Sequence, residues 1–151
     1  MPAAGFGVRI VMDTSVLVAA LRSRNGASES LLQSVLKQTL KPLISVPLVL
    51  EYEAVLTRPE QLAVSGLSKE EAVYLVKAFC RMGEEVSWAK RLRPQLRDPG
   101  DELVLETAFF GRAEAIVTFN RRDFSVVPER FGIEIISPQQ AIWRLNRYEN
   151  Q

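Results

Sequence analysis

Apolar and polar residues alternate in blocks along this chain, and the blocks predict a series of strands and helices. A continuous apolar run begins after Arg9, stops at Asp13 and resumes after Ser15. Such a run is typical of a strand buried on both faces, and its continuation is typical of a helix. By the same patterns, further strands are predicted at residues 43–46, 115–119 and 133–136, and further helices at 30–40, 47–58, 59–82, 101–110 and 138–147.

Turn and capping residues support these boundaries. Pro47 occupies a first helical turn, where its missing N–H is tolerated. Ser68 and Glu71 have the spacing of a capping box, and Gly83 is expected to end the helix that they begin. Residues 86–97 are mixed and rich in arginine, and we expect at most a short strand there.

The order of these elements predicts an α/β fold. Strands alternate with helices, and no internal repeat, low-complexity tract or linker divides the chain. We therefore expect one domain over residues 1–151, with a core from about residue 8 to residue 146. Its predicted architecture is a three-layer α/β/α fold around a central parallel sheet.

Composition limits the class of protein and its location. The chain is 47% hydrophobic and 25% charged, which is ordinary for a globular protein. A net charge of +1 neither demands nor excludes a nucleic-acid partner. Cys80 is the one cysteine, so no intrachain disulfide can form, which favours a reducing cytoplasm. We expect neither a signal peptide nor a membrane span, because no segment approaches the roughly 18 apolar residues that a span needs.

Histidine is absent from the sequence. Its absence excludes histidine-based triads, histidine acid–base catalysis and histidine-ligated zinc. With a single cysteine as well, any metal would have to be bound by oxygen atoms, the ligands that Mg²⁺ and Mn²⁺ prefer.

Candidate chemistry lies at the ends of two predicted strands. Asp13 follows the first strand, and Thr118, Asn120 and Asp123 lie at or beyond the end of the strand at 115–119. Carboxyl ends of parallel strands meet at one edge of a sheet, where open α/β folds bind ligands. These side chains can therefore converge on one crevice. The alternative for Asp13 is that it and Ser15 cap the following helix.

Two further acids are candidates on predicted helices. Asp101 shares a helical stripe with apolar residues, and a carboxylate directed toward the sheet must be paired, hydrogen-bonded or bound to metal. Its alternative role is an N-cap. Glu51 could reach the crevice from the helix at 47–58, or lie on a solvated flank, and Glu53 competes with it for that position. Asp98 and Glu102 lie off the apolar stripe, and we interpret both as solvated.

Several acids without histidine or paired thiolates are typical of a site for hard divalent cations. Two carboxylate-bound metals about 4 Å apart are a known apparatus for in-line phosphodiester hydrolysis. One activates the attacking water and the other stabilises charge on the leaving oxygen.

The chain also resembles a known family. The segments VMDTSVLVAAL, SVPLVLEYEAVL, DPGDELVLETA and VTFNRRDF, in this order, are similar to the acidic motifs of PIN domains. The resemblance runs from Arg9 to about Ile142 and is strongest to the VapC-like toxin components of prokaryotic toxin–antitoxin pairs.

The resemblance implies a ribonuclease that depends on Mg²⁺ or Mn²⁺. Its catalytic, metal-binding acids would be Asp13, Glu51, Asp101 and Asp123. Ser15, Thr118 and Asn120 would position these acids or the water that the metal binds. Many relatives have aspartate in place of Asn120, so in this chain Asp123 would be the fourth metal-binding acid. The resemblance also implies a homodimer and a cognate antitoxin whose tail fills the acidic groove.

Basic residues near the predicted acids are candidates for RNA binding. Arg22 and Arg24 follow the first helix, and Arg121 and Arg122 adjoin Asp123. Arginines at the rim of an acidic site could hold the phosphates on either side of the cleaved bond. The alternative is ordinary solvated surface.

Two other functions are compatible with the sequence. The chain could be a catalytically weak or inactive domain that binds protein or RNA through its acidic groove, and Asn120 favours that alternative. It could also be a phosphatase or phospho-acceptor domain, but that chemistry needs a lysine at a neighbouring strand end, and none is convincingly placed.

Overall fold

The computed structural model describes residues 8–23 and 26–149. In that part of the chain the strands are β1 (Ile10–Met12), β2 (Leu43–Ile44), β3 (Glu84–Glu85), β4 (Ala115–Val117) and β5 (Glu134–Ile136). The helices are α1 (Thr14–Arg22), α2 (Ala27–Leu36), α3 (Val46–Leu56), α4 (Pro59–Ser65), α5 (Lys69–Arg81), α6 (Pro99–Phe110), α7 (Val127–Phe131) and α8 (Pro138–Glu149), with a 3-10 helix, η1, at Arg121–Phe124.

The strands form parallel pairs. β4 lies between β1 and β5, and all three run in the same direction. Val11 is opposite Ile116, which is opposite Ile135 on its other side. β2 and β3 form a second parallel pair, with β2 beside β1. The predicted parallel sheet is therefore confirmed.

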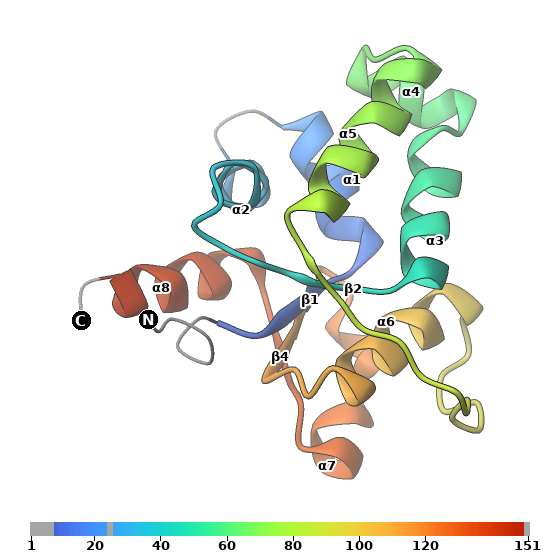
Figure 1. Cartoon of the computed structure of the whole chain (residues 1–151), viewed down its shortest axis with the longest axis vertical. Coiled ribbons are helices and arrows are strands. Elements are labelled where there is room, and N and C mark those ends of the chain that lie inside the picture. Colours follow the sequence, from blue (N-terminus) through green and yellow to red (C-terminus); the bar gives the residue numbers. More distant parts are fainter. Residues whose placement is uncertain (1–7, 24–25, 150–151) are drawn as a thin grey trace.

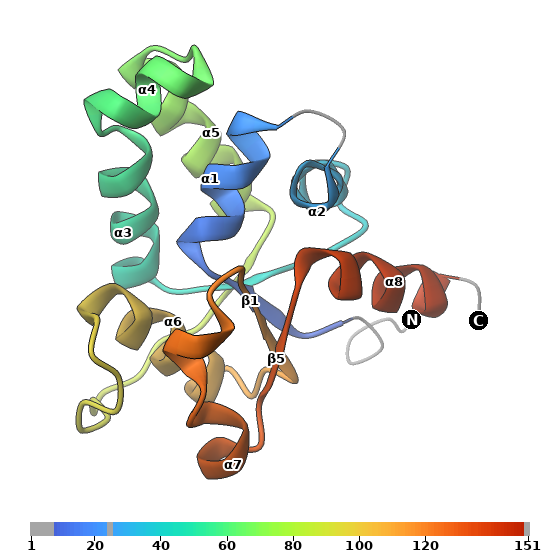
Figure 2. The same cartoon turned by 180° about the vertical axis from the view of Figure 1, so that it is seen from behind.

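Helices cover both sides of the strands (Figures 1 and 2). In Figure 1, α1 to α5 lie above the strands, and α6 and α7 lie on the other side. This arrangement confirms the predicted α/β fold. Within the described ranges, no helix is long and apolar enough to cross a membrane.

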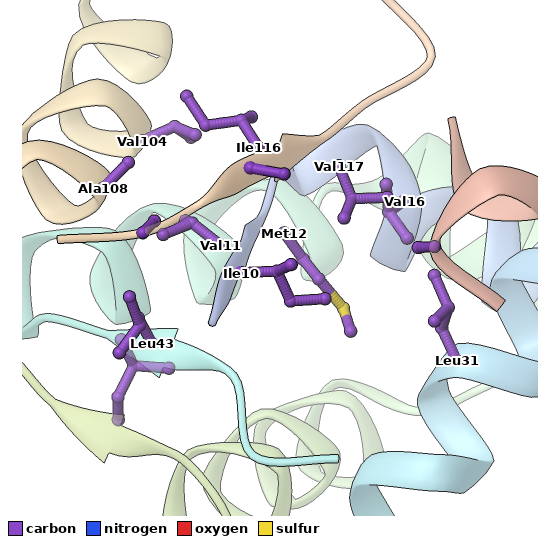
Figure 3. Close-up of a cluster of buried hydrophobic side chains, with 14 of the residues drawn as sticks. Ile10, Val11, Met12, Val16, Leu31, Leu43, Val104, Ala108, Ile116 and Val117 are labelled. Atoms are coloured by element: carbon purple, nitrogen blue, oxygen red, sulfur yellow. The ribbon is translucent and has the colours of Figure 1, made fainter. Parts of the chain in front are cut away.

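β1 and β4 are wholly apolar, as expected of strands that helices cover on both sides. All three residues of β1 and of β4 are buried. Figure 3 shows Ile10, Val11 and Met12 among side chains from the surrounding helices, including Val104 of α6 and Leu31 of α2. A strand so deeply buried gives its carboxyl end a rigid position.

The structure differs from the predicted helices in several places. α2 runs from Ala27 to Leu36 rather than over residues 30–40, and Gln38 adopts a positive φ of 65° just after it. The segment 59–82 forms two helices rather than one, because Gly66 adopts a left-handed conformation with φ of 76° at the end of α4. The capping box of Ser68 and Glu71 then begins α5, as predicted. The short helices η1 and α7 were not predicted, since neither is long enough to show a helical period.

Residues 86–97, where at most a short strand was expected, hold none; β3 ends just before them. The loop is attached to α6 instead. Glu102 accepts hydrogen bonds from the N–H groups of Gln95 and Leu96, and Glu106 accepts one from that of Leu92. The prediction that Glu102 is solvated is therefore wrong: it is buried by the loop that it holds.

Candidate active site

The carboxyl ends of β1 and β4 lie side by side, because the two strands are parallel and in register. Asp13 follows β1, and its backbone N–H donates to the Val117 carbonyl at 2.9 Å. Thr118 follows β4, and its N–H donates to the Ile136 carbonyl of β5 at 3.0 Å. The backbone ladder thus holds both residues at the same edge of the sheet.

Two hydroxyls orient the Asp13 carboxylate. Ser15 Oγ and Thr118 Oγ1 each donate to Asp13 Oδ2 at 2.7 Å. Thr118 Oγ1 in turn accepts from the backbone N–H of Asn120 at 2.9 Å. Asp13 occupies the N-cap position of α1, as that alternative held, but its carboxylate accepts from these two hydroxyls and from no backbone N–H of the helix. Helix capping therefore does not account for the Asp13 side chain.

Asp98, not Asp101, caps α6. Asp98 Oδ1 accepts from the N–H groups of Gly100 at 2.7 Å and Asp101 at 3.2 Å. The N-cap alternative for Asp101 is therefore wrong. Its half-buried side chain in the first turn of α6 is left to face the other acids.

Glu51 reaches the start of α6 from α3. A Cβ atom at Gly100 would lie 2.8 Å from Glu51 Oε2 and 3.0 Å from Asp98 Oδ1, so a larger residue there would displace these carboxylates. Two contacts fix α3: Ser45 accepts from the Leu48 N–H at 3.3 Å, and its Oγ lies 2.7 Å from Thr107 Oγ1 of α6. Glu51 and Asp101 therefore approach each other from packed helices.

The pKa of Asp101 is raised by burial and by the carboxylates around it. Burial and the neighbouring carboxylates of Asp13, Asp98, Asp123 and Glu51, in that order, raise the pKa of Asp101 from 3.8 to about 7. Desolvation and like charges both disfavour its ionised form. A bound cation would reverse this effect.

The acids line two adjoining cavities. The first, about 530 Å³, includes Asp13, Ser15, Glu51 and Asn120 in its lining. The second, about 580 Å³, includes Asp123. Asp98 and Asp101 line both. The predicted acids from β1, α3, α6 and η1 therefore come together, although their catalytic roles remain predictions.

The predicted RNA-binding arginines differ in where they lie relative to the two cavities. Arg22 lines the first cavity and donates to Gln61 Oε1 at 3.2 Å. Arg122 lines the second cavity. Arg121 donates to the Ile135 carbonyl at 3.1 Å, which commits one of its donors to the fold. Arg24 lies outside the described residues.

Sequence reasoning missed several lining residues. Arg58 and Phe119 line the first cavity, Arg97 lines the second, and the exposed Asp98 lines both. Phe119, between Thr118 and Asn120, could have been found from its position, since it follows the same strand. No sequence pattern indicated Arg58, because it reaches the cavity from the turn between α3 and α4, which has no periodic pattern.

The donor set fits a hydrated hard cation. Its atoms are carboxylate, hydroxyl and amide oxygens, and Gly100 provides the space in which Glu51 approaches Asp101. In the described part of the chain, no group of three or more His, Cys, Asp or Glu side chains is arranged to hold one ion directly. Mg²⁺ usually keeps several waters and binds through one or two carboxylates, so it does not need such a group.

A comparison with protein families agrees with this geometry. The family model described as PIN domain matches residues 9–122, which are 114 of the 151 residues. A comparison with curated proteins gives no match. The matched region begins just before β1 and ends within η1, and so includes Asp13, Glu51 and Asp101. The chain belongs to the PIN domain family, a family of nuclease type.

Proposed function

We propose that this protein is an endoribonuclease that hydrolyses RNA phosphodiester bonds with Mg²⁺ or Mn²⁺. The observation that carries the proposal is the Asp101 carboxyl, whose pKa is raised to about 7 by burial and by four surrounding acids. Such a cluster opposes folding unless a cation compensates it, and strongly perturbed groups in a cleft are candidates for function. The family, which is of nuclease type, supports a general ribonuclease role.

The metal-binding residues would be Asp13, Glu51, Asp101 and Asp123. When bound, Mg²⁺ or Mn²⁺ supplies an acidified water as nucleophile and charge neutralisation at the leaving oxygen. Asp13 is prepared for this role, because two hydroxyls occupy Oδ2 and fix the direction of Oδ1. Asn120 would act through its backbone, by holding the Thr118 hydroxyl.

Arginines on either side of the acids would bind the RNA backbone. Arg22 and Arg58 line the first cavity, and Arg97 and Arg122 line the second. Phosphates on both sides of the cleaved bond would be held there, while the acids act between them. We retain Arg24 and Arg121 as further contacts.

The finer assignment follows from the resemblance to VapC-like proteins. We propose that the chain is one PIN domain with its core at about residues 8–146. It would act in the cytoplasm as the toxin of a toxin–antitoxin pair, as a homodimer silenced by a cognate antitoxin. The cytoplasmic location is supported by the single cysteine, Cys80, which is free.

Cleavage of structured RNA by the purified protein tests the proposal. We expect cleavage with Mg²⁺ or Mn²⁺ and none with excess chelator. Asp101→Asn and Glu51→Gln should each lower the cleavage rate at least about a thousandfold, because each removes a metal ligand worth several kcal/mol in the transition state.

Glu53→Gln is the matched control, since Glu53 lies two residues from Glu51 on α3 but does not line the cavity. It should cleave RNA at the wild-type rate. Equal cleavage by wild type and Asp101→Asn would overturn the assignment. A wild type that neither binds metal nor cuts RNA would favour the inactive, binding-only PIN domain.

A further inference from the structure

Phe119 is an exposed aromatic residue within the acid-lined cavity. Its side chain is 55% exposed, although it follows directly from the buried strand β4. It lines the first cavity together with Asp13, Asp101 and Arg58. A large apolar ring is thus kept in water beside the residues that would act on the substrate.

The neighbouring site residues hold the Phe119 backbone in place. Its N–H donates to Ser15 Oγ at 3.4 Å, and Ser15 Oγ donates to Asp13. The preceding residue, Thr118, donates to the same Asp13 oxygen, and its hydroxyl accepts from the Asn120 N–H. The ring therefore projects from a segment whose backbone is fixed relative to the Asp13 carboxylate.

Other exposed hydrophobic side chains differ from Phe119. Phe109 packs edge-on against Phe110 and Phe131, and Trp143 packs against the Arg147 guanidinium. Of the large hydrophobic side chains exposed within residues 8–23 and 26–149, Phe119 alone lines a cavity that also contains the acids. No aromatic ring of the described residues packs against it.

We propose that Phe119 is a stacking platform for the nucleobase next to the cleaved phosphate. This inference rests on the proposed ribonuclease function. An aromatic ring stacks on any base, because every base has a π-face. A base paired in a duplex would first have to unpair and unstack to meet the ring, whereas a base in a loop or at an end is already free to do so.

The cavity suits one nucleotide. Its volume of about 530 Å³ lies in the range of small-molecule sites. Its lining offers three kinds of contact: acids for a metal at the phosphate, Arg22 and Arg58 for a neighbouring phosphate, and Phe119 for the base. Phe119 is a binding residue in this arrangement and takes no part in proton transfer.

The test uses a series of single-stranded oligoribonucleotides with one known cleavage site. Each RNA of the series has a single abasic position, at a different place along the RNA. Phe119→Leu keeps an apolar side chain but removes the π-face, and Phe119→Tyr keeps the π-face. On unmodified RNA, Phe119→Leu should raise KM by about five- to 150-fold, the equivalent of one lost stacking contact. Its kcat should stay close to that of wild type, and Phe119→Tyr should behave as wild type.

The abasic series separates stacking from a structural effect. When the abasic position adjoins the cleaved bond on the correct side, the KM of wild type should rise by the same factor. On that RNA, the difference in KM between wild type and Phe119→Leu should disappear. Phe109→Leu, at another exposed phenylalanine, is the matched control and should leave KM unchanged on every RNA. Equal KM for wild type and Phe119→Leu, or a difference that persists on every abasic RNA, would overturn the inference.

A failure of the proposed function looks different. If wild type neither binds nor cuts any of these RNAs, the ribonuclease assignment falls, and the inference falls with it. If wild type cuts duplex and single-stranded RNA equally well and Phe119→Leu has no effect, the ribonuclease stands and the base platform does not.

Discussion

Helix α6 carries acids in two opposite circumstances, Glu102 and Glu106 in one and Asp101 in the other. Glu102 and Glu106 are 7% and 1% exposed, and N–H groups of the 86–97 loop donate to both. Arg91 also pairs with Glu106 at 3.1 Å. Asp101, on the cavity side, is half-buried among carboxylates that raise its pKa to about 7. One set has its charges compensated by the fold, and the other does not.

The difference separates structural from functional carboxylates. A buried carboxylate that accepts several N–H bonds holds a loop in place, and deep burial alone is no sign of chemistry. A less buried carboxylate without such donors, next to like charges, costs stability and is retained for another reason. Among the acids of α6, partial burial with missing partners therefore identifies the candidate site residue, Asp101, better than deep burial does.

Breaking the compensated set should give the largest change in stability. Glu106→Gln keeps the shape of the side chain but turns one acceptor into an NH₂ group that faces the Leu92 N–H or the Arg91 guanidinium. An unsatisfied buried donor costs about 1–3 kcal/mol, which lowers the unfolding temperature of a domain of this size by about 3–10 °C. Thermal unfolding followed by circular dichroism measures this change.

Arg91→Ala is the control for that prediction. The Arg91 side chain is 72% exposed, so solvent screens its ion pair, and its loss should lower the unfolding temperature less than Glu106→Gln does. A larger loss for Arg91→Ala than for Glu106→Gln would show that the ion pair, rather than the backbone N–H bond, holds the loop.

The sequence predicted the framework and the acids but not the contacts between them. Strand ends could be read from apolar runs that stop at polar residues, and this located Asp13 and Thr118. The alternative that Asp101 caps α6 was wrong, because Asp98 and Asp101 both lie near the start of the helix and only the backbone conformation decides which one caps.

Tertiary contacts account for the remaining differences. Glu102 was interpreted as solvated because it lies off the apolar stripe of its helix, yet a loop without secondary structure covers it. Arg58 and Arg97 come to the cavities through turns of the chain, which leave no periodic signal. Long-range placement of loops is the part that local patterns do not encode.

Disturbing the orientation of Asp13 should have an effect of intermediate size, and we expect it on the RNA cleavage rate. Thr118→Val preserves side-chain shape but removes one of the two donors to Asp13 Oδ2 and the acceptor of the Asn120 N–H. A hydrogen bond to a charged group contributes about 1.5 kcal/mol, so the RNA cleavage rate should fall about tenfold. Steady-state cleavage assays measure it.

Thr39→Val is the control for Thr118→Val. The Thr39 hydroxyl donates to the Ser34 carbonyl at 3.1 Å, and Thr39 lines neither of the two acid-lined cavities. This variant should leave the cleavage rate unchanged. Equal rates for wild type and Thr118→Val would mean that Ser15 alone orients Asp13.

The smallest expected effect is the pH dependence of the uncompensated set. Folding raises the pKa of Asp101 from 3.8 to about 7, so the folded protein binds the Asp101 proton more tightly than the unfolded chain does. Its favourable contribution is complete below pH 3.8 and is lost as the pH rises through about 7.

In chelator, Asp101→Asn should therefore match wild type in unfolding temperature at low pH and exceed it at pH 8. Because solvent screens a half-exposed carboxyl, the excess is about 1 kcal/mol or less, or about 2–4 °C. Saturating Mg²⁺ should reverse the order at pH 8, since the ion stabilises only the protein that keeps its ligand. A difference between the two proteins that is independent of pH would mean that Asp101 is not the group whose charge the cavity disfavours.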